Sequence, residues 1–408
     1  MYSMVEGASA LRMFEESLAL KKQGFNFDFL FILGLRDFLK FRSDKEKWLS
    51  KIEKYTQSSE VFIFPRFPHN TGFFFKIIFV FLNSLICLLS FIKIGGKKKY
   101  TILHAHLDIF GFYSVIIKKF TGIINFYDCH GFRYEEFVLS KGGKHSKWLY
   151  SFEHSLEKYT LKNSDEVIAV SSNMVKYIEE LVSVKSSLVP MGINDKIINS
   201  NLELSELVRE RFDLVNSKTL VYCGNFSRYQ CFEYMKSLFT GLNKLSSDYQ
   251  FILLVPKKYA NDVRHFFSDS PNLPTKIFSV SHENVKHILS ACDLGVMLRE
   301  DSIVNRLASP TKFSEYLAAG LPVISTHFVG DYSQFMIKNQ AGLILELDKF
   351  NTSSYFDNVD EKIANLIRHS SQTIEKARLR NLAHKNNSWD ECTKNLIFLY
   401  EKYSKSGS

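Results

Sequence analysis

Short apolar runs alternate with longer amphipathic segments along almost the whole chain, and this alternation narrows the possible folds more than any other feature. Runs typical of buried strands occur in the first half at Phe29–Leu33, Val61–Phe64, Thr101–Ala105, Ile123–Tyr127 and Val167–Val170. They recur in the second half at Leu220–Gly224, Phe251–Val255, Lys276–Phe278, Leu294–Met297, Pro322–Ser325 and Gly342–Leu345. Strands that alternate with helices build βαβ units, so the sequence predicts an α/β fold with parallel sheets.

The chain is long enough for two domains. Its 408 residues include 45% hydrophobic residues, which suffices for two sizeable cores. A polar stretch without strand character separates the two halves. We therefore predict an N-terminal domain over 1–195, a linker over 196–217, a second domain over 218–384 and a C-terminal helix over 385–408. Trp389 would anchor that helix, which we expect to cross back to the first domain.

Composition points to a cytoplasmic protein with an anionic partner. The six cysteines are scattered, with no C-x-x-C pair, which favours reduced thiols. The first residues lack the basic and apolar regions of a signal peptide. Net charge is +9, and Lys and Arg are spread along the chain with no nucleic-acid motif. We therefore expect a phosphorylated ligand or an acidic membrane surface as partner, and no nucleic acid.

The segment from Gly72 to Tyr100 is unusually apolar. Lys76 and Lys93 interrupt it, and the stretch between them is shorter than the roughly 20 residues of a spanning helix. Two interpretations have equal support: a helix packed on a sheet, or a helix in the membrane interface with Lys97–Lys99 at the headgroups. A spanning helix is the least favoured. Peripheral membrane association through 73–99, at the inner face of the cytoplasmic membrane, would imply a lipid-linked acceptor.

The stretch from Arg299 to Ile324 carries the clearest chemical signal. Ser309 and Pro310 are typical of a helix start, with Ser as cap and Pro at the first helical position. The N–H groups of such a helix bind phosphate, and Lys312 adds positive charge. Glu315, one turn later, could accept hydrogen bonds from two ribose hydroxyls. The alternative is an ordinary capped helix with a surface glutamate.

Several segments, in order, resemble family 4 glycosyltransferases. They are Tyr127–Gly131, Ser164–Met174, Val189–Asn194, Leu220–Gln230, His287–Val296 and the helix after Ser309. This resemblance spans nearly the whole chain. It implies the GT-B fold, in which two Rossmann-like, doubly wound domains face a cleft. A doubly wound domain opens with a strand before its glycine loop, yet few residues precede Gly7. We therefore expect a truncated first strand or translation that begins upstream.

The resemblance also implies the site residues. The donor nucleotide-sugar would contact Gly7, Gly224, Asn225, Arg228, Val280, Ser309, Pro310, Thr311, Lys312 and Glu315. The catalytic group would comprise His130, nearest the reacting carbon, together with Arg228, Lys312 and Glu315. His106 and Arg133 are expected on the acceptor side.

The sequence departs from the family pattern at three positions. Leu307 stands where the family has a first acidic residue, Gln230 where it has lysine, and Cys231 where glycine is common. The Ser-Pro-Thr-Lys-Phe and Tyr-Gln forms resemble a subgroup of bacterial surface-polysaccharide assembly, in which Arg228 and Lys312 would supply the phosphate charge.

No metal or other cofactor is expected. His104 and His106 lie on one face of a predicted strand at a spacing that could suit a metal, but no third ligand is evident from the sequence. In a retaining transfer the departing phosphate takes the acceptor's proton, and the protein stabilises charge and orients the partners.

These observations predict a retaining hexosyl- or N-acetylhexosaminyltransferase. Its donor would be a nucleotide diphosphate sugar, best UDP-linked, and its acceptor a saccharide or lipid-linked sugar in capsule, O-antigen or lipopolysaccharide synthesis. A nucleotide-sugar 2-epimerase of the same fold is one alternative, although no convincing set of acid/base residues is evident. A non-catalytic GT-B subunit that binds a partner enzyme is the other.

Overall fold

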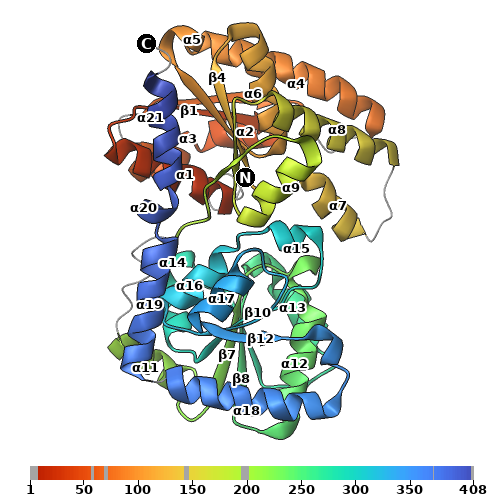
Figure 1. The fold of residues 1–408 in the computed structure, drawn as a ribbon, viewed down its shortest axis with the longest axis vertical. Helices are drawn as coiled ribbons and strands as arrows, with labels where there is room; N and C mark the ends of the chain where they lie inside the picture. Colours follow the sequence, from red (N-terminus) through yellow and green to blue (C-terminus); the bar gives the residue numbers. More distant parts are fainter. Residues whose placement is uncertain are drawn as a thin grey trace. The chain divides into compact units, whose positions relative to one another are not determined.

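The computed structural model describes residues 8–56, 59–68, 72–141, 147–193, 202–370 and 372–405. The chain forms two compact units (Figure 1). The first comprises Met1–Pro190 and Cys392–Ser408, and the second comprises Met191–Glu391. Both are α/β structures built on parallel strands, in agreement with the alternating sequence pattern.

The second unit contains one six-stranded sheet. Its strands are β7 (Lys218–Cys223), β8 (Tyr249–Leu254), β9 (Thr275–Phe278), β10 (Leu294–Met297), β11 (Val323–Thr326) and β12 (Gly342–Leu345). They lie in the order β12-β11-β10-β7-β8-β9, and every neighbouring pair is parallel. This is the Rossmann order, in which ligands bind beyond the carboxyl ends of the strands where the order reverses. Here that point lies between β7 and β10.

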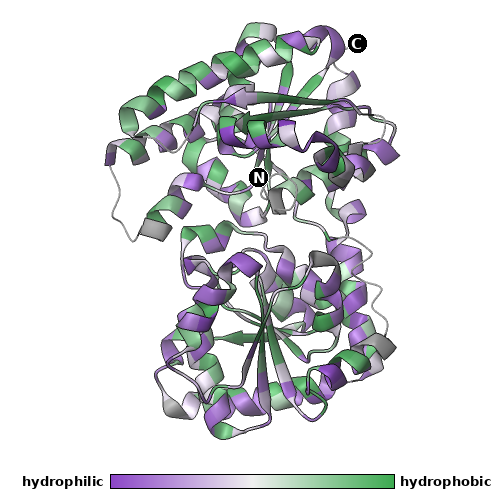
Figure 2. Ribbon diagram, turned by 180° about the vertical axis from the view of Figure 1, so that it is seen from behind, coloured by the Kyte–Doolittle hydropathy of each residue, from purple (hydrophilic) through white to green (hydrophobic). Residues whose placement is uncertain are grey.

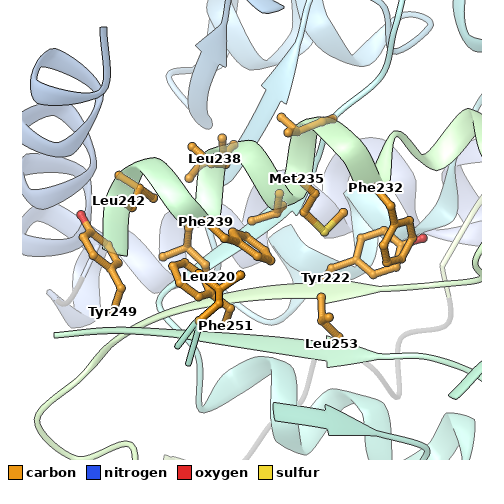
Figure 3. Packing of buried hydrophobic residues seen from close by; sticks show 14 of the residues in the cluster. Leu220, Tyr222, Phe232, Met235, Leu238, Phe239, Leu242, Tyr249, Phe251 and Leu253 are labelled. Carbon is orange, nitrogen blue, oxygen red and sulfur yellow. The ribbon is translucent and has the colours of Figure 1, made fainter. Parts of the chain in front are cut away.

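Helices cover both faces of this sheet because successive residues of each strand point to opposite sides. One core cluster contains Leu220 and Phe251, and the other contains their neighbours Val221 and Ile252. Helices α12 (Phe232–Leu245), α13 (Ala260–Phe267) and α18 (Ser353–Ser370) pack in the first cluster. Helices α14 (His282–Ser290), α16 (Thr311–Ala318), α17 (Tyr332–Asn339) and α19 (Thr373–Asn387) pack in the second. Figure 3 shows the apolar side of α12 lying on β7 and β8.

The first unit contains two separate parallel sheets. Strands β3 (Ile102–His106), β4 (Ile124–Cys129), β5 (Glu166–Ala169) and β6 (Ser187–Leu188) form one in that order, and β1 (Phe29–Gly34) pairs with β2 (Val61–Arg66) in the other. The helices are α1 (Ala8–Lys22), α2 (Leu35–Ser43), α3 (Lys45–Thr56), α4 (Phe73–Lys93), α5 (Gly96–Lys99), α6 (Asp108–Thr121), α7 (Arg133–Lys141), α8 (Lys147–Asn163) and α9 (Ser172–Val182). The expected truncated strand before Gly7 lies outside the described residues.

The unit boundaries differ from the domain boundaries expected from the sequence. The units divide at Pro190 and Cys392, whereas the sequence analysis placed boundaries at 195 and 385. The predicted linker over 196–217 contains a helix, α11 (Leu202–Arg211), which belongs to the second unit. The side chain of Arg209 on α11 forms an ion pair with Asp293, 3.3 Å away. Part of the polar stretch that the sequence analysis assigned to a linker therefore forms a helix on the surface of the second unit.

The C-terminal segment is divided between the units. Trp389, in the short helix α20 (Trp389–Cys392), packs against Gly192 in the second unit, where an added Cβ would lie 2.5 Å from the indole ring. The following helix, α21 (Lys394–Lys405), belongs to the first unit. Its Leu396 and Leu399 are buried in a core cluster with Phe126 of β4.

Helix α4 has an inverted distribution of polarity. Its packed face contains Lys76, Asn83, Ser84 and Ser90 among the buried residues, and it contacts α6. Its outer face exposes large apolar side chains, at Phe74, Phe75, Ile78, Phe81, Leu82, Leu85, Leu89 and Ile92. Figure 2 shows this helix as hydrophobic along most of its length. By length and composition alone α4 could cross a membrane. Its polar side, however, packs against the rest of the first unit, where Lys76 forms an ion pair with Glu153 of α8.

Candidate functional site

The second unit has a candidate ligand site at the carboxyl ends of β7 and β10. Three elements meet there: the loop after β7, the loop after β10 and the first turn of α16. The loop after β7 forms a short 3-10 turn over Arg228–Gln230 before α12 begins. Because β7 and β10 are neighbours in the sheet, residues far apart in sequence come together at this edge.

Two buried cations share one neutral acceptor at this edge. Lys312 Nζ donates to Gln230 Oε1 at 2.6 Å, and Arg299 Nη1 donates to the same oxygen at 2.6 Å. Lys312 is 9% exposed and Arg299 is 3% exposed. Among the described residues, neither cation forms an ion pair with a carboxylate. Gln230, which replaces the lysine of the family pattern, therefore holds two positive charges without neutralising them.

The electrostatics of this cluster favour an anionic ligand. Burial, with Arg299 close by, holds the pKa of Lys312 well below its usual range. Burial also lowers the pKa of Arg299, but a guanidinium stays charged in proteins. A buried charge without a counter-charge costs several kcal/mol, and an arriving anion would remove that cost.

Backbone geometry leaves room beside the cations. Gly224 follows β7 with φ +153, and a Cβ there would lie 2.4 Å from Lys312 Nζ. Cys231 has φ 55, in the left-handed region that favours glycine, the residue that is common at this position in the family pattern. The side-chain amide of Asn225 donates to the Tyr229 hydroxyl at 3.2 Å. Gly224 and Asn225 therefore lie at the edge where the sequence analysis expected the donor.

The start of α16 differs in detail from the expectation. Pro310 is the N-cap residue and Thr311 the first helical residue, and no side chain caps the helix. Ser309 was expected to cap, but its hydroxyl instead lies 3.3 Å from the backbone N of Met191 and 3.2 Å from the Tyr332 hydroxyl. The N–H groups of the first turn therefore lack a side-chain acceptor among the described residues. Glu315 is half-buried one turn further along, and Gly320 with φ +82 ends the helix.

Three predicted donor residues lie outside this cluster. Arg228 is exposed on the 3-10 turn, and its role at the phosphate stays a prediction. Val280 is 38% exposed after β9, a strand at the sheet edge. Gly7 lies outside the described residues. The sequence analysis gave Arg299 no role in the site, although its place two residues after the buried strand β10 was a usable signal once β10 is placed beside β7.

The first unit has a second polar cluster, at the carboxyl ends of β3 and β4. His106 ends β3, and Asp128 is its partner in the register of β4. His106 Nδ1 lies 3.1 Å and His130 Nε2 lies 3.2 Å from Asp128 Oδ2. Arg12 of α1 donates to both oxygens of Asp128, at 2.7 and 3.1 Å. The structure thus joins His106 and His130, which the sequence analysis predicted separately, through Asp128 and Arg12, which it did not identify.

Charge in this cluster is set by Arg12. Burial alone would raise the pKa of Asp128, but the Arg12 guanidinium, with hydrogen bonds from His106 and His130, holds it well below its usual range. Burial raises the pKa of Glu16, one turn after Arg12, to about 7. Leu107, directly after His106, has φ 75 and ψ 151, a conformation that glycine rather than leucine adopts readily. Such strain is frequent at ligand sites.

The cluster could also hold a metal ion by distance alone. Ligand atoms of Glu16, His104, His106 and Asp128 lie within 4.8 Å of one another. The sequence analysis found no third ligand beside the two histidines, and the structure brings two carboxylates to them from α1 and β4. Arg12 already occupies the position of a counter-ion to both carboxylates, 3.0 Å from Glu16 Oε1. The remaining predicted acceptor-side residue, Arg133, lies 3.8 Å from Asp108 at the start of α6.

Comparison with known proteins identifies the relatives of this chain. Residues 15–196 match the sequence model of Glycosyltransferase Family 4. A curated Escherichia coli protein, UDP-Gal:alpha-D-GlcNAc-diphosphoundecaprenol alpha-1,3-galactosyltransferase, is 22% identical over 296 residues, which cover 70% of this chain and 73% of the relative.

Solved structures with the same fold include a glycosyltransferase from Rickettsia africae, with a TM-score of 0.65 and 15% identity over 96% of this chain and 95% of that one. Another is Anabaena Alr3699/HepE in complex with UDP and glucose, with a TM-score of 0.64 and 13% identity over 97% of this chain and 96% of that one. These neighbours establish the GT-B fold that the resemblance implied. Together with the family match and the curated relative, they favour a transferase over the epimerase and scaffold alternatives.

Proposed function

Given that the chain is a hexosyltransferase of the GT-B type whose residues 15–196 match Glycosyltransferase Family 4, we propose that it moves a sugar from a UDP-sugar to a lipid-linked saccharide with retention of configuration. The acceptor lipid would be a diphosphate-linked polyprenol, like the diphosphoundecaprenol acceptor of the E. coli relative. The product would serve capsule, O-antigen or lipopolysaccharide synthesis.

The observation that carries this proposal is the pair of buried cations without a counter-charge. Lys312 and Arg299 converge on one Gln230 oxygen at the first turn of α16. A diphosphate supplies the missing negative charge, and the N–H groups of the helix start add further donors. Both cations would stabilise the charge that develops on the diphosphate as the sugar departs. On this account they take the neutralising role that a divalent cation plays in other transferases, and catalysis needs no metal.

Nearby residues fit a nucleoside. Glu315 lies about one turn beyond Lys312 on α16, and its carboxylate can accept hydrogen bonds from two hydroxyls. Gly224 allows the backbone to approach the ligand closely, because any side chain there would meet Lys312. We propose His130 as the residue nearest the reacting carbon of the sugar. We place no strong base in the mechanism, since the departing phosphate can accept the proton.

The outer face of α4 supports a lipid-linked acceptor. This face exposes Phe74, Phe81, Leu85 and Leu89 at 52 to 70%, and polar residues face inward, opposite to the usual pattern of a soluble helix. Lys97 and Lys98 are exposed directly after it. Large apolar side chains next to lysines are the composition of a helix that lies in an anionic membrane interface. We therefore place the enzyme peripherally at the cytoplasmic face of the membrane.

An acceptor-dependent transfer assay tests the proposal. The purified full chain is incubated with UDP-Gal, UDP-Glc or UDP-GlcNAc and with alpha-D-GlcNAc-diphosphoundecaprenol in liposomes, and the product is identified by mass and anomeric configuration by NMR. We expect one donor to give UDP release that depends on acceptor, with retention. Lys312→Met should abolish it, and the exposed control Lys244→Met should not. A product of inverted configuration, or no transfer from any UDP-sugar, would contradict the proposal.

A further inference from the structure

Two imidazoles in the first unit point at the same carboxylate oxygen. His106 Nδ1 lies 3.1 Å and His130 Nε2 lies 3.2 Å from Asp128 Oδ2, and the two ring nitrogens are 3.2 Å apart. Each ring therefore presents a specific nitrogen to Asp128. The opposite nitrogens are His106 Nε2 and His130 Nδ1.

Asp128 can only accept hydrogen bonds. Arg12 donates its Nε to Oδ2 at 2.7 Å and its Nη2 to Oδ1 at 3.1 Å, and all these atoms are buried. A buried carboxylate paired with a guanidinium in this way stays ionised. An ionised carboxylate has no proton to donate. Any imidazole nitrogen within hydrogen-bond distance of it must therefore carry a proton.

This requirement fixes the tautomer of each neutral ring. A neutral imidazole has one N–H and one lone pair, and the hydrogen bond made by one nitrogen determines the state of the other. His130 would then be protonated at Nε2 and His106 at Nδ1. In the competing arrangement, His106 donates to a lone pair on His130 Nε2. That places the lone pair 3.2 Å from an anionic oxygen, which is repulsive.

Among the groups that the structure describes, none supplies another acceptor for either ring. Glu16 Oε2 lies 3.9 Å from His106 Nε2, too far for a hydrogen bond. His104 stacks on His106, with ring centroids 4.5 Å apart, and its Nδ1 lies 3.1 Å from the Tyr400 hydroxyl. Burial and the neighbouring His106 hold the pKa of His104 well below its usual range, so this ring stays neutral. Arg12 and Asp128 therefore carry the fixed charges beside the pair.

We propose that Asp128 is a positioning residue that holds His130 in the Nε2–H tautomer, so that His130 Nδ1 presents a lone pair to a substrate hydroxyl. The His130 side chain is 12% exposed at the carboxyl edge of a parallel sheet, where ligands of this class of fold bind. The exposed nitrogen of the ring thus accepts a hydrogen bond from a substrate hydroxyl group. It has no N–H to donate to a phosphate. This inference rests on the proposed function for the identity of the ligand as a sugar.

NMR of the free full-length protein tests the tautomer without any turnover. Histidine is labelled with ¹⁵N, long-range ¹H–¹⁵N correlations distinguish the two ring nitrogens, and the His130 signals are assigned by their loss in His130→Asn. The spectrum is recorded at a pH at which the His130 ring is neutral, and we expect its single proton on Nε2. A proton on Nδ1 would overturn the proposal, whatever the transfer assay shows. A shift of the His106 and His130 signals on addition of Zn²⁺ alone, with loss of the N–H contacts, would overturn it in favour of a metal centre.

Variants test the consequence for recognition. The amide of His130→Asn places an acceptor near the position of Nδ1, whereas His130→Gln places one near Nε2. We expect His130→Asn to keep a kcat/KM at least tenfold above that of His130→Gln, and the reverse order would contradict the proposal. Asp128→Asn should give a mixture of His130 tautomers and a raised KM; an unchanged tautomer would also contradict it. Should Asp128→Asn fail to fold, the wild-type tautomer still decides.

Discussion

Gln230 shows how one substitution in a family pattern can be understood once its contacts are known. Its carboxamide oxygen accepts from Lys312 and Arg299, both at 2.6 Å, where a lysine would add a third positive charge. A neutral acceptor orients two cations and leaves their charge available to a ligand. On the proposed function, the positive charge at the phosphate would come from the loop after β10 and from α16, and not from this position after β7.

Gln230→Glu should change the thermal stability of the protein and its affinity for UDP in opposite directions. A carboxylate at this position would pair with both buried cations and remove the cost of their isolation. We expect a higher midpoint of thermal unfolding and an affinity for UDP at least tenfold lower, measured by calorimetry. The exposed Gln334→Glu, which carries the same change in charge, should alter neither. Tighter UDP binding by Gln230→Glu would contradict the assignment of the phosphate to this cluster.

Nucleotide binding should take up a proton at Lys312. Burial and Arg299 lower the pKa of the free ammonium, and a bound diphosphate would raise it. Between these two values the free protein binds fewer protons than the complex, so affinity falls as pH rises through the lowered pKa. Calorimetry in buffers of different ionisation enthalpy, above the pH at which the nucleotide phosphate ionises, measures this uptake. We expect it to vanish in Lys312→Met; equal uptake in that variant would assign the proton to another group.

At the residue scale, the sequence predicted the side chains that act within one local segment and missed those that act across the sheet. Lys312 and Glu315 were identifiable because one helix start carries both. Arg299 was not, because its contact with Gln230 depends on β10 lying beside β7. Asp128 lies within the Tyr127–Gly131 segment of the resemblance, yet its role depends on Arg12, which is distant in sequence. The phosphate-binding role of Arg228 stays a prediction.

Helix α4 explains at the element scale why an apolar segment had two equal interpretations. The helix is packed on one side and exposed on the other, because its polar face packs against the rest of the first unit and its apolar face is exposed to solvent. Lys99 pairs with Asp28 at 2.9 Å and with Glu60. Among the described residues, Lys97 and Lys98 form no such pair.

This difference among three consecutive lysines gives a matched test of membrane binding. Each unpaired lysine near an anionic surface contributes about 1 kcal/mol. We expect Lys97→Gln with Lys98→Gln to weaken sedimentation with vesicles containing phosphatidylglycerol by about 30-fold, since 1.4 kcal/mol corresponds to tenfold. Lys99→Gln removes one charge, from a position that Asp28 and Glu60 neutralise, and should have little effect. Equal losses in both variants, or none, would contradict the interfacial placement.

Helix α6 packs closely against β4 because position 111 on the helix is a glycine. A Cβ at Gly111 would lie 2.4 Å from the Tyr127 ring and 2.9 Å from Thr160. Gly111→Ala should therefore lower the free energy of unfolding of the first unit by about 1–3 kcal/mol, the usual cost of overpacking. Chemical denaturation measures the change. Gly72→Ala, where an added Cβ meets nothing within 4 Å, serves as control, and comparable losses in both variants would show that packing is not the cause.

Elements were predictable where one physical signal dominated. The strands of the second unit are apolar runs bounded by turns, and β10 and β12 begin and end at the predicted residues. The sequence analysis did not predict helices α2, α3 and α7, which are short, highly charged segments that resemble loops. Helix α11 was assigned to a linker for the same reason.

At the scale of the whole molecule, the alternating pattern predicted the fold class but not the division of strands into sheets. The first unit pairs β1 with β2 separately from the other four strands. Which strands pair in one sheet depends on which apolar faces of the strands the helices cover. The alternation of apolar and polar residues along the sequence carries no information on this choice. The six-stranded sheet of the second unit, by contrast, follows the order expected of a Rossmann-like domain.

A crystal structure of the full chain with UDP tests the central claim most directly. We predict that the diphosphate lies within hydrogen-bond distance of Lys312 Nζ and of the first N–H groups of α16, with the ribose hydroxyls on Glu315. UDP bound elsewhere, with the Lys312–Gln230–Arg299 contacts unchanged and no phosphate beside them, would contradict the account.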